Sequence, residues 1–192
     1  MSISESLFKN LSRHISLDEK EVEEITPAFK TKLLKKNAVL LQPGEICRNI
    51  YFVDQGCLRL FNTDANGFEH NIMFCPEGWW AADMASFSGQ VPAFYHIAAL
   101  EDSRIFYLSY SDLETLYVRI PKLERFFRIL IQNGFSLYQF RINSNLANTA
   151  EERYEIFRKQ YPGLEQRIAQ KHIATYLGIT PVFLSRIRKR LP

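Results

Sequence analysis

The spacing of apolar and polar residues changes twice along the chain, from helical to strand-like and back to helical. At the start, residues 2–14 and 17–29 repeat apolar side chains at helical spacing, in the second segment among many acidic ones, which predicts two short amphipathic helices. Asp18 followed three residues later by Glu21 is typical of a helix start. Thr26-Pro27 indicates where the second helix ends.

Residues 31–109 have the sequence pattern of short strands separated by turn residues. The turn signals include Pro43-Gly44, Gln55-Gly56 and a hairpin loop at 64–67. Residues 79–92 are rich in small side chains and are predicted to be irregular. The predicted strands lie at 32–35, 38–42, 49–54, 57–63, 68–75, 94–100 and 104–108. Their near-regular spacing predicts an antiparallel β-sandwich or β-roll.

A second helical segment begins near Ser111, with a short helix at 112–119 and a long one at 121–148. Apolar residues recur along the long helix at steps of three and four, over about seven turns at 3.6 residues per turn. A helix this long has more apolar surface than one small domain covers, which predicts a helix–helix dimer interface. Gly134 either lets two backbones approach closely or only weakens the helix. The residues expected at the interface are Leu123, Phe127, Leu130, Gly134, Leu137 and Tyr138.

The last 23 residues, Gln170–Pro192, have the pattern of a helix-turn-helix and follow a predicted helix at 150–159. Gly178 sits at the turn, where a positive φ is wanted and glycine adopts it without strain. Thr180 is a good N-cap, and Pro181 suits the first helical position. The apolar positions that two steeply crossing helices would bury are Ile173, Ala174, Leu177, Leu184 and Ile187.

Charge is unevenly distributed along the chain. The net charge of the whole sequence is +3, but from Glu151 onward nine Lys and Arg residues face four Asp and Glu residues. No acidic residue occurs from Gln166 to the end of the sequence. A near-neutral body with a basic end indicates that the C-terminal part meets a polyanion.

Several protein classes are disfavoured by what the sequence does not contain. The three cysteines, Cys47, Cys57 and Cys75, form no CxxC pair and fit buried thiols in a reducing cytosol better than a disulfide scaffold. There is no signal-peptide pattern and no window long enough to span a membrane, so we expect a cytoplasmic protein. Catalytic motifs and metal-ligand histidine spacing are also missing, so we expect no enzyme, metal or cofactor.

The order of β-roll, long helix and helix-turn-helix resembles the Crp/Fnr superfamily of bacterial transcription regulators. Residues 41–45 (LQPGE) resemble the family's first β-turn, and residues 50–59 (IYFVDQGCLR) resemble its glycine-containing strand pair. Residues 173–188 (IATYLGITPVFLSRIR) resemble its recognition unit. The resemblance implies an α+β fold in three parts. These are a cyclic-nucleotide-binding-like antiparallel β-roll with N-terminal helices at 1–120, a dimerisation helix at 121–148 and a helix-turn-helix domain at 149–192.

The same resemblance implies a homodimer on double-stranded DNA, with each recognition helix in a major groove and RNA polymerase as a further candidate partner. Arg186 is the strongest base-reading candidate, because a guanidinium pairs bidentately with guanine. Val182 suits a thymine methyl or simple packing, and Ser185 suits a base or a phosphate. The family's base-reading positions fall on Pro181, Val182, Ser185 and Arg186. Phosphate contacts are expected from Gln170, Lys171, Thr180, Arg188, Lys189 and Arg190.

The family's phosphate-binding cassette is only partly matched. Its Gly-Glu-Leu step reads Ala82-Asp83-Met84, its later Arg-Ser/Thr pair falls near Ala93-Phe94, and no arginine occurs between Arg59 and Arg104. A cyclic phosphate requires a bidentate cation, so we expect no response to cAMP or cGMP of the usual kind. Another small-molecule effector stays open, although Trp80 also suits plain core packing. The residues expected around such an effector are Trp80, Ala82, Asp83, Met84, Phe94 and Tyr95.

The sequence therefore predicts a sequence-specific, DNA-binding transcription regulator of Crp/Fnr type. Many family members carry a wing after the recognition helix, whereas this sequence ends at Pro192, so we expect Arg188, Lys189 and Arg190 to supply more of the backbone contact. In the alternative, the β-roll is a ligand-binding or protein-interaction module and the shortened C-terminal domain has lost specific DNA binding. Salt distinguishes the two, because DNA binding weakens steeply as salt rises.

Overall fold

The computed structural model describes residues 4–190, which divide into two compact units. The first unit contains the chain up to Leu60 together with Phe74–Gly134. The second contains Phe61–Met73 and the chain from Phe135 onward. This division differs from the predicted domain boundaries at residues 120 and 148, which stay a prediction. Across the described range, no helix combines the length and the apolar character needed to cross a membrane.

The first unit begins with two short helices, α1 (Glu5–Ser12) and α2 (Glu19–Ile25). The Asp18 carboxylate accepts a hydrogen bond from the Glu21 N–H, and the Glu21 carboxylate accepts one from the Asp18 N–H, both at 2.9 Å. This reciprocal pair satisfies two donors that have no partner within the helix, so it fixes the start of α2. The helix gives way to the 3₁₀ turn Thr26–Ala28, which confirms the predicted end.

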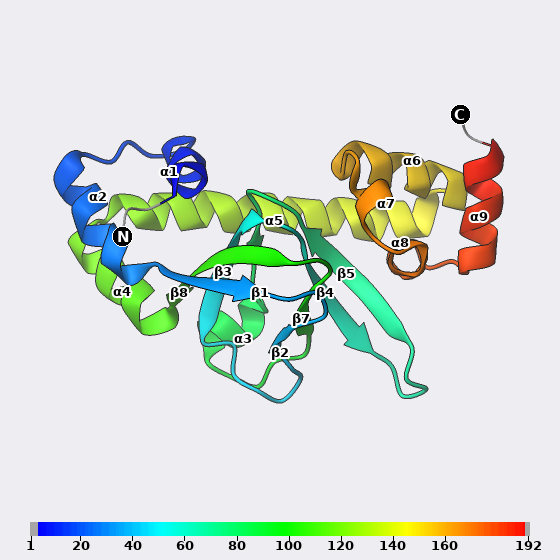
Figure 1. Ribbon diagram of the computed structural model, residues 1–192, viewed down its shortest axis with the longest axis horizontal. Helices are drawn as coiled ribbons and strands as arrows, with labels where there is room; N and C mark the ends of the chain where they lie inside the picture. Colours follow the sequence, from blue (N-terminus) through cyan, green and yellow to red (C-terminus); the bar gives the residue numbers. More distant parts are fainter. Residues whose placement is uncertain (1–3, 191–192) are drawn as a thin grey trace. The chain divides into compact units, whose positions relative to one another are not determined.

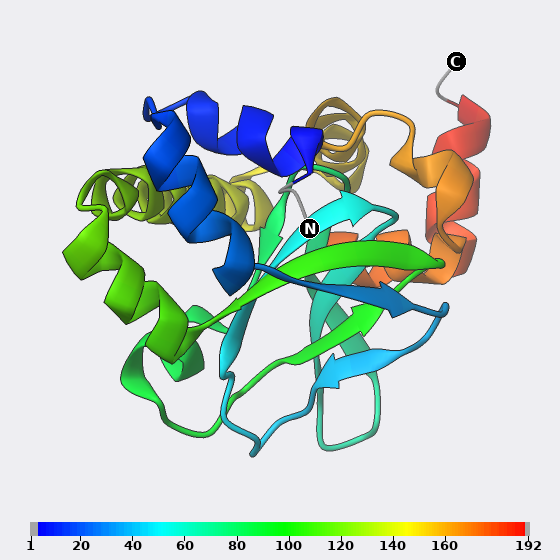
Figure 2. The ribbon, with the colours of Figure 1, turned by 60° about the vertical axis from the view of Figure 1, so that its left-hand side comes forward.

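Two four-stranded sheets form the body of the fold (Figures 1 and 2). The pairs β1–β8, β8–β3, β3–β6 and β2–β7 are all antiparallel. The first sheet runs in the order β1 (Lys30–Leu34), β8 (Ser103–Ser109), β3 (Asn49–Gln55) and β6 (Trp80–Ala81). The second runs in the order β2 (Val39–Leu41), β7 (His96–Ala99), β4 (Leu58–Thr63) and β5 (Glu69–Cys75). The predicted antiparallel β-roll is confirmed, and each predicted strand ends within two residues of an observed one.

The prediction of an irregular segment at 79–92 is wrong. Trp80 and Ala81 form strand β6, in which Trp80 lies opposite Phe52 of β3. A short helix, α3 (Met84–Gly89), follows and is capped by Asp83, whose carboxylate accepts the Ser86 N–H at 3.1 Å. Both elements are too short for their periodicity to be visible in the sequence, so only the tertiary contacts reveal them.

Two more helices complete the first unit, α4 (Tyr110–Arg119) and the start of α5 (Lys122–Ala147). Trp80 packs against Phe52 with ring centroids 5.2 Å apart and against Phe127 at 5.4 Å. Its indole N–H donates to the side-chain oxygen of Asn10 at 2.9 Å. An aromatic ring whose polar atom is hydrogen-bonded is a stable core element. Because Phe127 belongs to α5, its contact with Trp80 places the first turns of α5 over the aromatic core of this unit.

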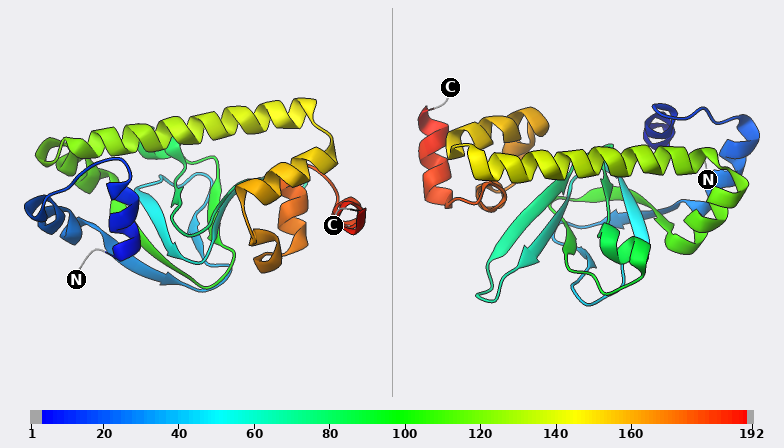
Figure 3. Two further views of the ribbon diagram at one scale, coloured as in Figure 1. Left: turned by 90° about the horizontal axis from the view of Figure 1, so that it is seen from above. Right: turned by 180° about the vertical axis from the view of Figure 1, so that it is seen from behind.

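The second unit is mainly helical. Figure 3 shows α5 as one continuous ribbon followed by the helices of the C-terminal part. The Thr149 hydroxyl and the Glu152 carboxylate form a capping box at the start of α6. The remaining helices are α6 (Ala150–Gln160), α7 (Leu164–Arg167), α8 (Gln170–Leu177) and α9 (Pro181–Arg190). The predicted long helix and both predicted helices of the helix-turn-helix are therefore present.

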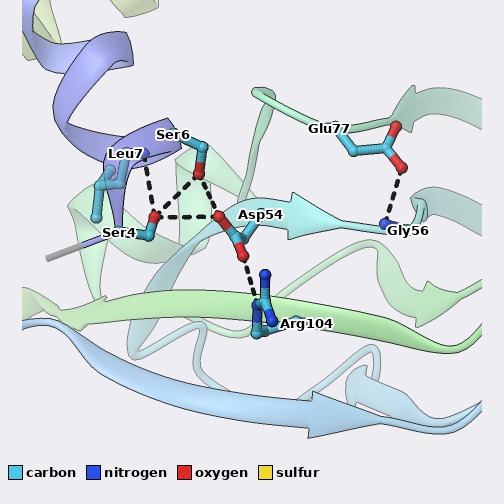
Figure 4. Close-up of polar contacts among 7 residues, drawn as sticks. All are labelled: Ser4, Ser6, Leu7, Asp54, Gly56, Glu77 and Arg104. Atoms are coloured by element: carbon cyan, nitrogen blue, oxygen red, sulfur yellow. Dashed lines mark hydrogen bonds and ion pairs between the residues drawn. The ribbon is translucent and has the colours of Figure 1, made fainter. Parts of the chain in front are cut away.

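The turn after β3 depends on a glycine. Gly56 has φ +93°, and a Cβ at this position would lie 2.8 Å from the carbonyl oxygen of Asp102. Its N–H donates to the Glu77 carboxylate at 2.9 Å (Figure 4). Both the left-handed backbone and the close approach exclude a side chain here, as the predicted Gln55-Gly56 turn requires.

Asp54 connects the N-terminal helix to the roll (Figure 4). Its carboxylate is 4% exposed and accepts hydrogen bonds from the hydroxyls of Ser4 and Ser6 and from the Arg104 guanidinium. Ser4 also caps α1 by accepting the Leu7 N–H at 3.2 Å. Burial by itself would raise the pKa of Asp54, but these donors outweigh burial and lower that pKa below its ordinary value of 3.8.

We expect Asp54→Asn to lower the free energy of unfolding at neutral pH by about 1–3 kcal/mol, because the amide loses charge-assisted hydrogen bonds. A lowered folded-state pKa adds stability that is complete above the ordinary carboxyl pKa and lost as pH falls through the folded-state value. The difference between variant and parent should therefore shrink in acid. Urea unfolding over a pH series measures it. Asp102→Asn is the control, since Asp102 is 62% exposed in its pair with Lys35, and two equal effects would contradict the prediction.

Candidate nucleic-acid interface

The turn of the helix-turn-helix contains a left-handed glycine followed by a threonine N-cap. Gly178 has φ +67° and ends α8, and the Ile179 N–H donates back to the Ala174 carbonyl at 3.0 Å. Thr180 then caps α9, because its hydroxyl accepts the Phe183 N–H at 3.2 Å. The Gln170 side chain donates to the Pro181 carbonyl at 3.2 Å and so joins the starts of the two helices. Glycine and threonine therefore have the predicted roles.

Apolar packing holds the two helices together. The five residues predicted to be buried between them are all at most 3% exposed, namely Ile173, Ala174, Leu177, Leu184 and Ile187. An aromatic cluster continues this core, with Tyr176 at 5.7 Å from Phe157 and 5.8 Å from Tyr161 between ring centroids. The buried side of α9 is thereby fixed, which determines the side that it presents to solvent.

The solvent side of α9 carries most of the predicted DNA contacts. Val182, Arg186 and Lys189 follow at steps of four and three and are exposed, whereas Ser185 beside them is half-buried. Pro181, Arg188 and Arg190 are exposed as well. In the part of the chain that the structure describes, no acidic residue lies on α9. This arrangement gives a positively charged helix face, as a nucleic-acid reader requires.

Two of the predicted phosphate-contacting residues also have structural roles. Gln170 joins the helix starts, and Thr180 is the N-cap of α9. Arg188 lies near the α6 side, where its charge acts on Tyr154. Burial and the Glu165 carboxylate raise the pKa of Tyr154 to about 12, against the opposing effect of Arg188. Lys171, by contrast, is exposed and keeps its side chain available.

Phe183 is an exposed position that the sequence reasoning missed. It is 38% exposed at the start of α9, next to Val182, which is 65% exposed. The signal was available, because Phe183 precedes the buried Leu184 and therefore cannot share its face. An aromatic ring at the N-terminal end of a recognition helix offers apolar contact to a base edge.

Arg141 of α5 fastens α8 to its surroundings within the second unit. Its guanidinium donates to the carbonyls of Asn71 at 2.8 Å and Tyr176 at 2.9 Å, and also to that of Ile72. The same group lies 4.0 Å from the ring centroid of Tyr176. Only a planar, forked cation can make these contacts together, so Arg141 determines where the C-terminal end of α8 lies relative to α5.

Asn71 completes this attachment from strand β5. Its side chain is 1% exposed and donates to the Thr175 hydroxyl at 2.6 Å and to the His172 carbonyl at 3.2 Å. Sequence reasoning missed both Asn71 and Arg141 as positioning residues. A signal existed for Arg141, which stands four residues after Leu137 on an otherwise apolar stripe. A single asparagine in a strand gave no comparable signal.

We expect Arg141→Lys to destabilise the second unit by about 1.5–3 kcal/mol, because an ammonium keeps the charge but cannot reach three carbonyls and a ring at once. Chemical unfolding followed by tyrosine fluorescence would measure the loss. Arg128→Lys is the matched control on the same helix, where the exposed Arg128 donates to Gln132 at 3.0 Å. Similar unfolding midpoints for the two variants would contradict the role of Arg141.

The predicted dimer residues divide into two groups. Leu123 and Phe127 are 2% and 3% exposed in the core of the first unit, so they have no surface left for a partner, and their assignment to the interface is corrected. Leu130, Gly134, Leu137 and Tyr138 are half-buried. The large apolar side chains that α5 leaves exposed are 49–83% exposed and lie instead at Ile131, Phe135, Phe140, Ile142 and Leu146.

The residues expected around an effector differ widely in exposure. Trp80 is part of the core, which corrects its assignment, while Met84 and Phe94 are exposed. Asp83 is 2% exposed, and its carboxylate accepts the N–H groups of Phe94 at 2.8 Å and Tyr95 at 3.1 Å. Ala82 is buried and Tyr95 half-buried. A carboxylate therefore already occupies the backbone donors that an incoming anion would need.

The three cysteines are buried thiols. Burial raises the pKa of Cys47 to about 11 and raises the pKa of Cys75 well above its ordinary value. The thiolate, which is the reactive form, is therefore disfavoured at both sites at neutral pH.

Comparisons with known proteins agree with this geometry. Residues 31–119 match the family model of the cyclic nucleotide-binding domain. The chain is 26% identical over 188 residues to the anaerobic regulatory protein of Pasteurella multocida, covering 92% of this chain and 68% of that protein. It is also 26% identical over 187 residues to the fumarate and nitrate reduction regulatory protein of Vibrio cholerae, covering 91% and 74%.

A solved structure shows the same fold. A transcriptional regulator of the Crp/Fnr family from Eubacterium rectale superposes with a TM-score of 0.70 at 18% identity, over 91% of this chain and 83% of that one. The curated relatives are regulatory proteins rather than enzymes. The matched cyclic nucleotide-binding domain, the helix-turn-helix and these relatives together support a transcription regulator of Crp/Fnr type.

Proposed function

We propose that this Crp/Fnr-type regulator binds double-stranded DNA as a homodimer in the cytoplasm, with α9 of each copy entering a major groove. The observation that carries the proposal is the exposed basic face of α9 on a helix-turn-helix whose other face is fixed by its core. The excess of basic residues from Glu151 onward supports a polyanionic partner. The alternative in which specific DNA binding is lost is not favoured by the relatives.

Each exposed residue of α9 then takes a role from its position. Arg186 reads guanine through its forked guanidinium, and Val182 contacts a thymine methyl with Phe183 beside it. Ser185 and Pro181 lie along the same edge of the helix. Backbone phosphates are contacted by the flanking residues, which orient the protein without reading sequence. These are Gln170, Lys171, Thr180, Arg188, Lys189 and Arg190.

The dimer is proposed to form through the exposed stripe of α5. Ile131, Phe135, Tyr138, Ile142 and Leu146 follow at steps of four, three, four and four, which places them on one face of the helix. Four of the five are exposed and apolar. Two copies of this face would pack as a two-fold helix pair, because a self-complementary surface closes with two-fold symmetry. The operator would then have two half-sites about one helical turn apart.

The roll is not proposed to bind a cyclic nucleotide in the family's usual way. The buried carboxylate of Asp83 accepts the N–H groups of Phe94 and Tyr95, and a cyclic phosphate placed there would meet a like charge. Any effector would have to be of another chemical class. RNA polymerase is a further proposed partner, because one way for a DNA-bound regulator to act is to contact it.

We expect Arg186→Ala to reduce discrimination between the operator and unrelated DNA, at a cost of about 1–3 kcal/mol for the preferred sequence. Lys189→Ala should weaken binding to all sequences alike and reduce the salt slope by about one. Selection from random DNA supplies the operator, and fluorescence anisotropy in a salt series measures both effects. An equal loss on every sequence from both changes would contradict the assigned roles.

We expect Ile142→Glu to convert the protein to a monomer, because it buries a carboxylate at the centre of the proposed stripe. Sedimentation equilibrium measures the mass. Val118→Glu is the matched control, since Val118 on α4 is 83% exposed but lies outside the stripe. A parent protein that already sediments as a monomer, or a variant that stays dimeric, would rule out this interface.

A further inference from the structure

A small cavity lies inside the second unit, beneath the C-terminal end of α8. Its volume is about 20 Å³, and residues of α5, α6 and α8 line it. Space of this size holds one solvent-sized particle and no organic ligand. Two arginines are part of its lining, Arg141 from α5 and Arg153 from α6. Ser144, Gln160 and Tyr176 lie in the lining as well.

The two guanidinium groups are only partly satisfied. The terminal nitrogens of Arg141 donate to the carbonyls of Asn71, Ile72 and Tyr176. One terminal nitrogen of Arg153 donates to the Asn148 carbonyl at 2.9 Å. Among the described residues, the Nε atoms of both arginines are buried and have no acceptor. Buried donors without acceptors are rare in folded proteins, so each of these two requires an explanation.

The residues around the cavity also carry an excess of positive charge. Its lining contains two arginines and no carboxylate. The Tyr176 carbonyl belongs to the C-terminal end of α8, and the Asn148 carbonyl directly follows the end of α5. A helix C-terminus is equivalent to about half a negative charge, so two such ends offset about one of the two positive charges. About one positive charge is left, next to two N–H donors.

We propose that this cavity binds a single monovalent, monoatomic anion, with chloride as the ordinary occupant. Such an ion accepts from both Nε–H groups and neutralises the remaining charge in a space that excludes larger anions. A water molecule is the weaker fit, because it supplies no negative charge to offset the remaining positive charge. Bound chloride would stabilise the packing of α8 on α5 and α6, independently of any contact with DNA.

Halide-dependent stability of the full chain is the first test. Thermal unfolding is compared in sodium chloride, sodium bromide and sodium gluconate at one ionic strength, without DNA. Chloride and bromide should raise the melting temperature over gluconate by roughly 2–4 °C, with saturation as the halide concentration rises. Arg153→Met should abolish this shift. Lys159→Met removes one charge from an exposed position of the same helix and should keep it.

Crystals of the unaltered chain grown in bromide give the second test, which does not depend on any variant folding. An anomalous peak in the cavity, within hydrogen-bonding distance of both Nε atoms, would support the proposal. Ordinary water density without an anomalous signal would overturn it. A halide shift that persists in Arg153→Met would equally overturn it. Neither readout involves DNA, so failure here and failure of the proposed DNA binding are distinguishable.

Discussion

The guanidinium of Arg141 is the contact on which the arrangement of the second unit depends. Three carbonyls and the ring of Tyr176 surround it, so α5, β5 and α8 meet at one side chain. A helix-turn-helix of about 20 residues has too little apolar surface to hold its own orientation. The cation contributes to that orientation, because its two terminal nitrogens donate to carbonyls of β5 and of α8 at once. The direction in which α9 presents its basic face follows from this arrangement.

Helix α5 serves two purposes with two adjacent stripes. The stripe that contains Leu123 and Phe127 is buried in the aromatic core of the first unit. The neighbouring stripe, which contains Phe135 and Ile142, stays exposed in a single chain. In the sequence the two stripes look like one wide apolar band, because their residues lie on neighbouring sides of the helix and both recur at steps of three and four. Burial separates them, and the second stripe, unlike the first, has surface to offer a partner.

Local chemistry was readable from the sequence, and long-range chemistry was not. The glycine at 178, the N-cap at Thr180 and the capping pair of Asp18 depend only on near neighbours, and all three have their predicted roles. The contact between Asn71 and Thr175 joins residues 104 positions apart, and no pattern in either segment announces it. Helix α3 was missed for a different reason, since six residues carry too little periodicity to be recognised.

The carboxylate of Asp83 occupies backbone N–H donors that could otherwise bind an anion. This buried carboxylate accepts the N–H group of Ser86 on one oxygen and the N–H groups of Phe94 and Tyr95 on the other. Such a group of backbone donors is an anion-binding arrangement by itself. Because the anion here is supplied by the chain, ordering this part of the roll needs no ligand. Internal charge contacts thus hold one segment in each unit, the 94–95 segment of the roll through the Asp83 carboxylate and the end of α8 through the Arg141 guanidinium.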